Sequence, residues 1–375
     1  MIEVRLMRAI VVGLGEVAQN LLDILLLKPK EAPPHLDIVA VVDRGGAAIS
    51  PKGLDLNGLL KTKRTNGSVV FYPAGRKGVN AIDAIESVEA EVVLELTSSK
   101  FSNGEPGLSH MKKALNSGKH VVTVNKISLA RGWAELNNIA SSKGTLLRFS
   151  GTVGGGTPIL NFAKNFHWSE IRSIQGILNG TTNYILTRMA ESDVSMEAAL
   201  REAQTAGFAE SNPSYDIDGI DTACKLVILA NWTMNRKTSI EDVQIEGISN
   251  IKRDDIRESM RRNGRIKLVG SINRRLIVKP MFVPRFDPIC VDGALNAVSF
   301  KIELLDEVTV TGKGAGGRET ARAILSDLMN LERRTTCAKD QLKSNIPSHA
   351  SPVLGCSHMN SCFPESQVFS HNKSL

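Results

Sequence analysis

The sequence predicts an α/β protein in which a Rossmann-type, doubly wound parallel sheet is joined to a second domain of the α+β class. Two observations predict the first part: apolar runs alternate with helical periodicity up to residue 149, and a glycine-rich turn follows the first run. Strands that alternate with helices form parallel sheets. From residue 265 the apolar runs follow one another without helices between them, which is typical of antiparallel strands.

The first 149 residues contain five short apolar runs that are predicted to be strands. They are residues 7–12, 37–42, 92–96, 120–124 and 145–149. Helical periodicity, with apolar residues three and four positions apart, is found in residues 16–27, 109–117 and 129–142. Residues 45–68 are rich in Gly, Lys, Asn and Thr, so a loop is expected there.

The pattern changes after residue 150. Residues 150–158 contain too many glycines for a helix or a strand and predict a tight loop. Helices are predicted at residues 181–190, 195–206, 216–234 and 319–331, and strands at 265–274, 276–284, 297–304 and 307–314. Residues 333–375 are rich in Ser, Asn and Pro and have no apolar period, so we predict that this tail is disordered.

Composition and charge exclude several classes of protein. The net charge is +7, and the Lys and Arg residues are spread along the chain without interleaved aromatic residues, which argues against nucleic-acid binding. No run of about 18 apolar residues is present, so no membrane span is expected. The amino terminus enters the first strand directly and lacks the features of a signal peptide. We therefore expect a weakly basic cytoplasmic protein that binds an anionic small molecule.

Five cysteines are spread widely, at positions 224, 290, 337, 356 and 362. An odd number at irregular spacing argues against a disulfide framework and agrees with a reducing cytoplasm. Three of them lie in the tail with His349 and His358, which raises the alternative of a zinc site. The spacing matches no standard zinc motif, and a disordered extension is the preferred interpretation.

A dinucleotide-binding turn is predicted between the first strand and the first helix. The segment reads Gly13-Leu14-Gly15-Glu16-Val17-Ala18. In such a turn the first glycine allows a sharp bend, the second lets the backbone approach a pyrophosphate, and a small third residue lets helix and strand pack closely. The helix N-terminus then offers free N–H groups to the phosphates. The alternative is a tight turn that binds nothing, but the strand–turn–helix context favours binding.

The end of the second strand bears on the choice between NAD and NADP. Asp43 ends this strand and Arg44 follows it. A carboxylate here accepts from the ribose 2′-hydroxyl of NAD, whereas a guanidinium pairs with the 2′-phosphate of NADP. Both residues are present, so the choice stays open. A slight preference for NADP comes from the positive charge of Lys61, Lys63 and Arg64.

Two further segments are predicted to lie at the carboxyl edge of the same sheet. Thr97 and Ser98 follow the strand at 92–96, and Lys126 follows the strand at 120–124. Ligands of doubly wound sheets bind at this edge. By position alone, Lys126 is equally compatible with a charged residue that only ends a strand.

Residues 203–225, which read AQTAGFAESNPSYDIDGIDTACK, are the most informative segment. Asp218, Asp221 and Lys225 are spaced by three and four residues and are predicted to share one face of the helix at 216–234. The apolar run LVILA follows Lys225, which indicates that part of this helix is buried. The alternative is an exposed Asp–Lys pair, which is common and stabilises a helix only weakly.

This combination of residues suits the reduction of a carbonyl group. A carbonyl that accepts hydride needs a proton at its oxygen, and a partly buried lysine such as Lys225 can supply it. The ammonium and hydroxyl groups of a substrate need carboxylate partners. Glu210, Asp216 and Asp221 can provide them.

The segment also resembles a known family. The pattern AxxxGFAExNPxxDIxGxDxxxK, which ends at Lys225, is similar to the signature of homoserine dehydrogenases at every fixed position. Further segments resemble the same family and extend the resemblance over about residues 7–332: GLGEVA, HVVTVNKISLA, GTVGGGTPIL, LNGTTNYILTRM and GKGAGGRETARAIL.

The resemblance implies an NAD(P)-dependent enzyme that interconverts L-homoserine and L-aspartate 4-semialdehyde, in threonine and methionine biosynthesis, as a homodimer. It implies that Lys225 donates the proton to the aldehyde and that Lys126 lies near the reacting centre and the nicotinamide. Glu210 and Asp221 would hold the substrate. The residues that would line the cofactor are Val17, Thr97, Gly207, Glu210 and Gly316. The alternatives are another Rossmann-type amino-acid dehydrogenase and a dinucleotide sensor without turnover.

Two other properties follow from the resemblance. Relatives often bind sodium through backbone carbonyls, and the matching positions are Val153, Gly155 and Thr157. A carboxylate position of that site is Ser150 here, and a hydroxyl is a poorer ligand for a hard cation. The chain has no room for the regulatory domain of some relatives, so feedback control by threonine is not implied.

The predicted organisation has four parts. Residues 1–149 form the dinucleotide-binding domain, and residues 150–310 form the catalytic and dimerisation domain. Residues 311–332 return to the first domain, and residues 333–375 are the tail.

Overall fold

The computed structural model describes residues 7–27, 36–166 and 169–344, with the side chains of its last helix described as far as Leu331. The chain divides into two compact units, residues 1–333 and 334–375. The account below concerns the first unit, apart from the end of the last helix. The four Cys and His residues of the alternative zinc site that follow position 344 lie outside the described residues.

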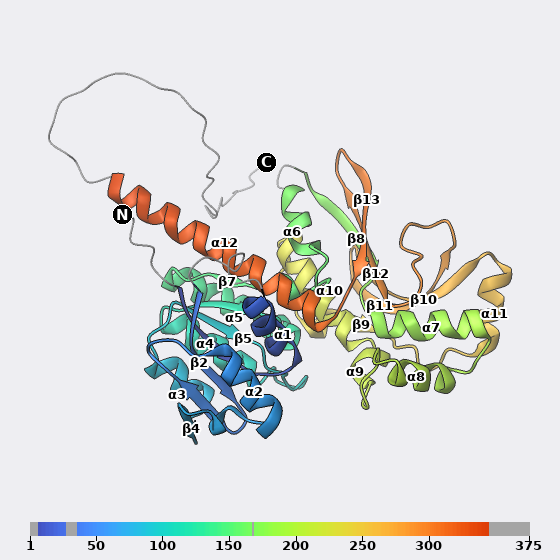
Figure 1. The fold of residues 1–375 in the computed structure, drawn as a ribbon. Helices are drawn as coiled ribbons and strands as arrows, with labels where there is room; N and C mark the ends of the chain where they lie inside the picture. Colours follow the sequence, from blue (N-terminus) through green and yellow to red (C-terminus); the bar gives the residue numbers. More distant parts are fainter. Residues whose placement is uncertain (1–6, 28–35, 167–168, 345–375) are drawn as a thin grey trace, which may run out of the picture. The chain divides into compact units, whose positions relative to one another are not determined.

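The predicted doubly wound sheet is confirmed (Figure 1). Its strands are β1 (Met7–Val12), β2 (Leu36–Asp43), β3 (Gly46–Ile49), β4 (Gly75–Lys77), β5 (Val92–Glu95), β6 (His120–Thr123) and β7 (Leu147–Arg148), in the order β4-β3-β2-β1-β5-β6-β7. β1 pairs in parallel with β2 on one side and with β5 on the other, whereas β3 and β4 are antiparallel at one edge. The chain order therefore reverses between β1 and β5, and the carboxyl ends of these strands frame the crevice in which such sheets bind ligands.

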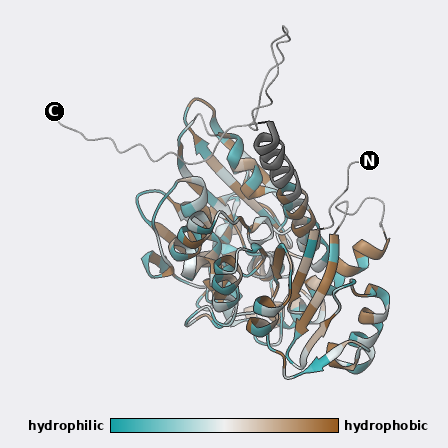
Figure 2. Ribbon diagram, turned by 90° about the vertical axis from the view of Figure 1, so that its left-hand side faces the viewer, coloured by the Kyte–Doolittle hydropathy of each residue, from teal (hydrophilic) through white to brown (hydrophobic). Residues whose placement is uncertain are grey.

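Helices cover both faces of this first sheet. They are α1 (Glu16–Leu27), α2 (Leu56–Asn66), α3 (Ala81–Ser87), α4 (Gly107–Asn116), α5 (Lys126–Lys143) and, from the end of the chain, α12 (Gly317–Ser344). Ala9 and Val11 of β1 share a buried cluster with α1, α2 and α12, while Ile10 and Val12 belong to the cluster that contains α3, α4 and α5. Strands that are buried on both faces are largely apolar, as the brown strands of this sheet in Figure 2 show, whereas the edge strand β4 is polar and partly exposed.

The segment 45–68 is not the loop that the sequence predicts, because it contains β3 and α2. Asp55 caps α2 by accepting hydrogen bonds from the backbone N–H groups of Asn57 and Gly58, both at 3.1 Å. Leu59 and Leu60 bury the helix against the sheet. Two adjacent leucines in a polar helix give no repeating apolar pattern, which is why periodicity missed it.

The second half of the chain forms a six-stranded sheet in the order β13-β12-β8-β10-β11-β9. Its strands are β8 (Ile171–Ile177), β9 (Val243–Ile245), β10 (Gly264–Ile272), β11 (Leu276–Pro284), β12 (Leu295–Ile302) and β13 (Asp306–Lys313). The four strands predicted after residue 265 are confirmed. Their pairings with one another and with β8 are antiparallel, whereas β11 pairs in parallel with β9. β8 and β9 were not predicted, and β9 is only three residues long.

The helices of this half are α6 (Ile159–Ala163), α7 (Gly180–Ser192), α8 (Met196–Thr205), α9 (Ser214–Ile217), α10 (Ile220–Thr233) and α11 (Arg253–Arg261). The long helix predicted at 216–234 is divided into α9 and α10 by Gly219, whose φ of +81° is left-handed. Asp218 therefore precedes α10 and is exposed, so the prediction that it shares a helix face with Asp221 and Lys225 is wrong.

The last helix, α12, is longer than the sequence predicts. The predicted helix ends at residue 331, with disorder from 333, but α12 continues to Ser344. The added residues include Ala, Lys, Gln and Leu and no Gly or Pro, so helix propensity favours continuation. Among the described helices, none is long and apolar enough to cross a membrane.

Candidate active site

The glycine-rich turn joins β1 to α1 as the sequence predicts. Gly13 has a φ of +95°, and a Cβ atom there would lie 3.0 Å from the backbone of Leu96, so only glycine fits. The space beside Gly15 is open to 4 Å. Ala18 is buried against the sheet, as close packing of helix and strand requires. The turn therefore has the shape that a pyrophosphate needs at a helix N-terminus.

Asp43, at the end of β2, is already fully engaged. Its carboxylate accepts from Lys63 Nζ at 2.7 Å and Ser68 Oγ at 2.8 Å, and from the backbone N–H groups of Gly45 and Val69 at 2.9 and 3.0 Å. Burial opposes its ionisation, but these hydrogen bonds, led by that of Lys63, hold the pKa of Asp43 below its usual value. A carboxylate with four donors has little capacity left for a ribose hydroxyl.

The basic residues near Asp43 divide into two groups. Lys63 is paired with Asp43, and Arg64 donates to Asp23 at 2.5 Å. Arg44 is exposed, and neither it nor Lys61 pairs with any residue in the part of the chain that the structure describes. These two cations are the ones available to an anionic ligand.

Thr97 lies beyond the carboxyl end of β5, next to the glycine-rich turn. Its hydroxyl and its N–H group both donate to Glu95, a fully buried carboxylate. The backbone oxygen of Thr97 accepts from the Asn125 side chain at 3.0 Å. Ser98 is exposed.

Glu95 and Asn125 were not predicted from the sequence. The glutamate within the apolar run VVLEL could have been noticed, because a charged residue in a buried strand needs hydrogen-bond partners.

The centre of the site is an aspartate between two lysines. Lys126 Nζ lies 2.7 Å from Asp221 Oδ1, and Lys225 Nζ lies 2.7 Å from Asp221 Oδ2. Lys126 is the first residue of α5, which Asn125 caps, whereas the other two are one turn apart on α10. Lys225 also donates to the backbone oxygen of Leu178 at 2.6 Å. The structure thus joins three predicted residues from two distant segments.

The two lysines differ in their electrostatics. The negative charge of Asp221 raises the pKa of Lys126, whose side chain is 35% exposed. Burial lowers the pKa of Lys225, whose side chain is 5% exposed, despite the same aspartate. Burial opposes ionisation of Asp221, but the charges of Lys126 and then Lys225 hold its pKa well below the usual value. Lys225 is therefore the lysine that releases a proton more readily.

Of the other two predicted substrate residues, Asp216 lies beside Asp221, whereas Glu210 forms no hydrogen bond with it in the part of the chain that the structure describes. Asp216 accepts from the Asn179 side chain at 2.6 Å, and Asn179 also donates to Asp221 at 2.8 Å. Burial, and next the charge of Asp221, raise the pKa of Asp216. Glu210 is exposed, and within the described residues no hydrogen bond or ion pair joins its carboxylate to this cluster. Asn179 was not singled out by the sequence.

The remaining predicted cofactor residues lie in two loops. Gly207 ends the turn after α8, where its N–H donates to the Gln204 backbone oxygen at 3.1 Å. Gly316 precedes α12, and its backbone oxygen accepts from Thr320 N–H at 2.9 Å. Neither residue touches the lysine–aspartate cluster through a hydrogen bond in the described part of the chain.

The predicted cation loop, residues 150–158, turns tightly as expected. Ser150 donates from its N–H and its hydroxyl to the buried carboxylate of Asp327 on α12, at 2.8 and 2.6 Å. The backbone oxygen of Thr157 accepts from Ile159 N–H at 2.8 Å, and its hydroxyl donates to the Lys313 backbone oxygen. Within the described residues, no group of three His, Cys, Asp or Glu side chains is placed to hold a metal ion.

Two other features are excluded from the site. Cys224 lies beside Asp221, and burial raises the pKa of its thiol to about 12, so it is a poor nucleophile.

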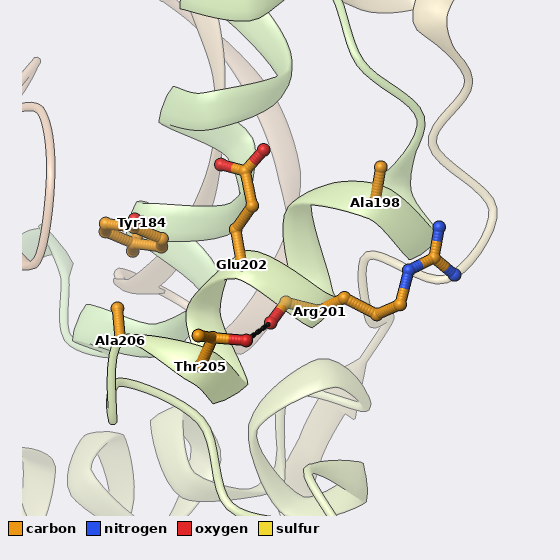
Figure 3. Close-up of a pocket in the computed structure, with 6 residues that line it drawn as sticks. All are labelled: Tyr184, Ala198, Arg201, Glu202, Thr205 and Ala206. Atoms are coloured by element: carbon orange, nitrogen blue, oxygen red, sulfur yellow. Dashed lines mark hydrogen bonds between the residues drawn. The ribbon is translucent and has the colours of Figure 1, made fainter.

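A surface hollow between α7 and α8 is lined by Tyr184, Ala198, Arg201, Glu202, Thr205 and Ala206 (Figure 3). None of the predicted site residues lines it.

Comparison with known proteins covers both halves of the chain. A family model described as homoserine dehydrogenase matches residues 158–329, and one described as homoserine dehydrogenase, NAD binding domain, matches residues 13–150. A homoserine dehydrogenase of Methanocaldococcus jannaschii is 42% identical over 334 residues, which cover 88% of this chain and 99% of that one. An NAD(+)-dependent homoserine dehydrogenase of Pseudomonas canavaninivorans is 36% identical, with 87% and 96% covered.

Solved structures agree with the sequence matches. A putative homoserine dehydrogenase from Archaeoglobus fulgidus superposes with a TM-score of 0.80 at 36% identity, covering 87% of this chain and 99% of that one. A hyperthermophilic archaeal homoserine dehydrogenase in complex with NADPH superposes with a TM-score of 0.76 at 27% identity, covering 88% and 98%.

Proposed function

The chain belongs to the homoserine dehydrogenase family and is an NAD(P)-dependent oxidoreductase, and we propose that its substrate reacts at the cluster of Lys225, Asp221 and Lys126. The family's reaction interconverts L-homoserine and L-aspartate 4-semialdehyde. The observation that carries the proposal is that each carboxylate oxygen of Asp221 lies 2.7 Å from a lysine nitrogen. A dinucleotide sensor without turnover is not favoured, because groups with opposed pKa shifts typically gather at catalytic sites.

Lys225 is the proposed proton donor to the carbonyl oxygen in reduction, and the acceptor from the hydroxyl in oxidation. Its lowered pKa supports this role, since acid–base groups act best when their pKa approaches the working pH. Lys126 keeps its charge, because Asp221 raises its pKa. We assign Lys126 to the neighbourhood of the carbonyl oxygen and the nicotinamide.

Carboxylates would hold the rest of the substrate. Asp221 contacts both lysines and is the proposed partner of the substrate hydroxyl. Asp216 is the proposed partner of the α-ammonium group, supported by its position beside Asp221 on Asn179. Glu210 is proposed as a second partner from the loop before α9, where its exposed side chain is free to turn toward a ligand.

The residues at the crevice suit a nicotinamide dinucleotide, as the left-handed turn at Gly13 and the open space beside Gly15 indicate. When bound, the cofactor supplies or accepts the hydride. The residues that would hold it are Gly13, Leu14, Gly15, Val17, Ala18, Thr97, Ser98, Lys126, Gly207, Glu210 and Gly316. Hydrogen bonds with Glu95 and Asn125 hold Thr97 in place at the edge of this crevice.

We propose that NADP is the preferred cofactor. One relative is NAD(+)-dependent and another binds NADPH, so this chain's own residues must decide. Asp43 is neutralised by Lys63, which leaves no free carboxylate for the 2′-hydroxyl of NAD. Arg44 and Lys61 are unpaired within the described residues and can meet a 2′-phosphate.

Replacing Arg44 by Ala is expected to lower kcat/KM for NADP by roughly 10- to 100-fold, the value of a hydrogen bond to a charged group. The value for NAD should stay nearly constant, because NAD has no 2′-phosphate. Homoserine-dependent absorbance at the reduced-nicotinamide band measures both. The matched control is Arg64→Ala, since Arg64 is already paired with Asp23. Equal losses with both cofactors would contradict the role of Arg44.

The residues do not fit the sodium site of the relatives. The carboxylate position is Ser150, whose hydroxyl donates to Asp327, and the Thr157 backbone oxygen accepts from Ile159. Without a carboxylate at that position, the Val153, Gly155 and Thr157 carbonyls make an incomplete shell for a hard cation. No part of the mechanism is therefore assigned to a cation.

We further propose a homodimer built on the second sheet. Phe286 and Leu304, in loops of this sheet, are 86% and 89% exposed, and large exposed apolar side chains are common at interfaces. Light scattering should give a mass near twice the 40.6 kDa of one chain. A mass of one chain at micromolar concentration would rule out a stable dimer.

The domain limits of residues 1–149, 150–310 and 311–332 are part of the same proposal. The two separate sheets, β1–β7 and β8–β13, support a division near residue 150, and the packing of α12 in the cluster with α1 supports a return segment. β13 extends to Lys313, so the limit at 310 falls inside this strand. A reducing cytoplasm is likewise the proposed location.

A further inference from the structure

A single turn contacts three residues of the proposed active site, Lys225, Asp216 and Asp221. This turn, Leu178–Asn179, lies between β8 and α7. The backbone oxygen of Leu178 accepts from Lys225 Nζ at 2.6 Å. The side-chain amide of Asn179 donates to Asp216 Oδ1 at 2.6 Å and to Asp221 Oδ2 at 2.8 Å.

We propose that Asn179 is a positioning residue that holds Asp216 and Asp221 side by side as a receptor for the ammonium and hydroxyl groups of one amino-acid substrate. This inference rests on the substrate roles proposed above for the two aspartates. It assigns to Asn179 a function in substrate affinity that goes beyond capping a helix.

The orientation of the Asn179 amide is fixed by its own surroundings. Its Oδ1 atom accepts from the backbone N–H of Thr182 at 2.8 Å and from the Thr182 hydroxyl at 3.0 Å, as the N-cap of α7. An amide oxygen can accept these bonds and an amide nitrogen cannot. The nitrogen must therefore face the carboxylates. Asn179 is 4% exposed, so water does not compete easily for its donors.

A neutral amide is suited to this position. Two carboxylates held close together repel, and the pKa of one of them rises. Here it is the pKa of Asp216, because Lys126 and Lys225 keep Asp221 ionised. The N–H group that Asn179 donates to Asp216 opposes this without adding a charge that would repel an ammonium group. The Asn179 hydrogen bond lowers the pKa of Asp216, against the effects of burial and of Asp221.

The charged groups around Asp216 come from two helices. Asp221 and Lys225 lie on α10, and Lys126 lies on α5. Loss of the Asn179 donor should raise the pKa of Asp216 further, because the hydrogen bond from Thr181 and the lysine charges, which lower this pKa, are unchanged. A protonated Asp216 binds an ammonium group weakly, so the effect appears in the pH dependence of homoserine use.

The test is the variant Asn179→Ser in the full-length enzyme. Serine is a good N-cap and keeps the fold of α7, but its short hydroxyl cannot reach both carboxylates. We expect kcat/KM for homoserine to fall by roughly 10- to 100-fold, mainly through KM, as two charge-assisted hydrogen bonds are lost. The acid limb set by Asp216, which lies at lower pH than the limb set by Lys225, should move to higher pH, while KM for the cofactor stays constant.

Asn80→Ser is the matched control, because Asn80 is the N-cap of α3 and accepts from Asp83 N–H at 3.0 Å. It should leave homoserine kinetics unchanged. The isosteric variant Asn179→Asp keeps the cap acceptor and places a third carboxylate beside the other two, so a larger rise in KM is expected than for serine.

Two outcomes separate this inference from the proposed function. An unshifted acid limb in Asn179→Ser, with an unchanged KM for homoserine in both Asn179 variants, would overturn the positioning role. Asp216→Asn must raise KM for homoserine if the aspartate binds substrate. An unaltered KM in Asp216→Asn would instead refute the proposed role of Asp216, whatever Asn179 does.

Discussion

Turnover of the Lys225→Ala variant is expected to fall by about 10²- to 10⁴-fold in both directions, the range for loss of a positioned acid–base group. The physical reason is that Lys225 is buried, has a lowered pKa, and lies one helical turn from Asp221. The charge of Asp221 remains compensated by Lys126, so the fold should persist. Stopped-flow absorbance at the reduced-nicotinamide band measures the chemical step.

The pH profile gives a sharper signature than the rate alone. Homoserine oxidation needs Lys225 without its proton, so wild-type kcat/KM should rise with pH and level off below the ordinary lysine pKa of 10.5. The variant should lack this limb, while NADPH fluorescence reports normal binding. Lys237→Ala, at an exposed lysine beyond the same helix, is the control. A variant that retains the limb would remove Lys225 from proton transfer.

The sequence predicted the first sheet well because its strands are buried on both faces. β1, β2 and β5 each contain a continuous buried apolar run, residues 9–12, 38–42 and 92–94, so each strand is recognisable from the sequence without knowledge of its neighbours. The same reasoning failed for α2, where only Leu59 and Leu60 are buried among polar residues. It also failed at Gly219, because a glycine within an apolar pattern does not reveal its φ.

The candidate site was predicted in part. Lys126, Asp221 and Lys225 were identified by spacing and by resemblance, and the structure brings their side chains together. Their convergence could not be derived from local pattern, because Lys126 and Lys225 are 99 positions apart in the chain. Supporting residues such as Glu95 and Asn179 act through hydrogen bonds to functional groups. A glutamate or an asparagine in the sequence does not by itself predict such a positioning role.

The second large effect is expected from Asp221→Asn. Asp221 compensates two lysine charges, and its side chain is 9% exposed. Removal of one partner from a buried ion pair leaves an uncompensated charge, which costs about 3–5 kcal/mol. We therefore expect the free energy of unfolding at pH 7 to fall by about that amount, as measured by urea titration with homoserine and cofactor absent.

The pH dependence of the free energy of unfolding distinguishes loss of the ion pair from nonspecific destabilisation of the fold. The pKa of Asp221 is lower in the folded protein than its usual 3.8, so its contribution is fully present above that value and is lost as pH falls toward the folded pKa. The difference between wild type and variant should thus be constant from pH 5 to 7 and narrow at more acidic pH. A difference that widens on acidification would contradict the ion-pair explanation.

Asp218→Asn is the matched control, since it makes the same change three residues earlier at an exposed position. It should alter the free energy of unfolding by less than about 0.5 kcal/mol.

In Asp221→Asn the pKa of Lys225 should fall further, because the charge of Asp221 raises this pKa against the effect of burial. The rate of aldehyde reduction should then decline at a lower pH than in wild type, as fewer molecules carry the proton that Lys225 must donate. A reduction profile that coincides with wild type would mean that Asp221 does not set the proton affinity of the donor.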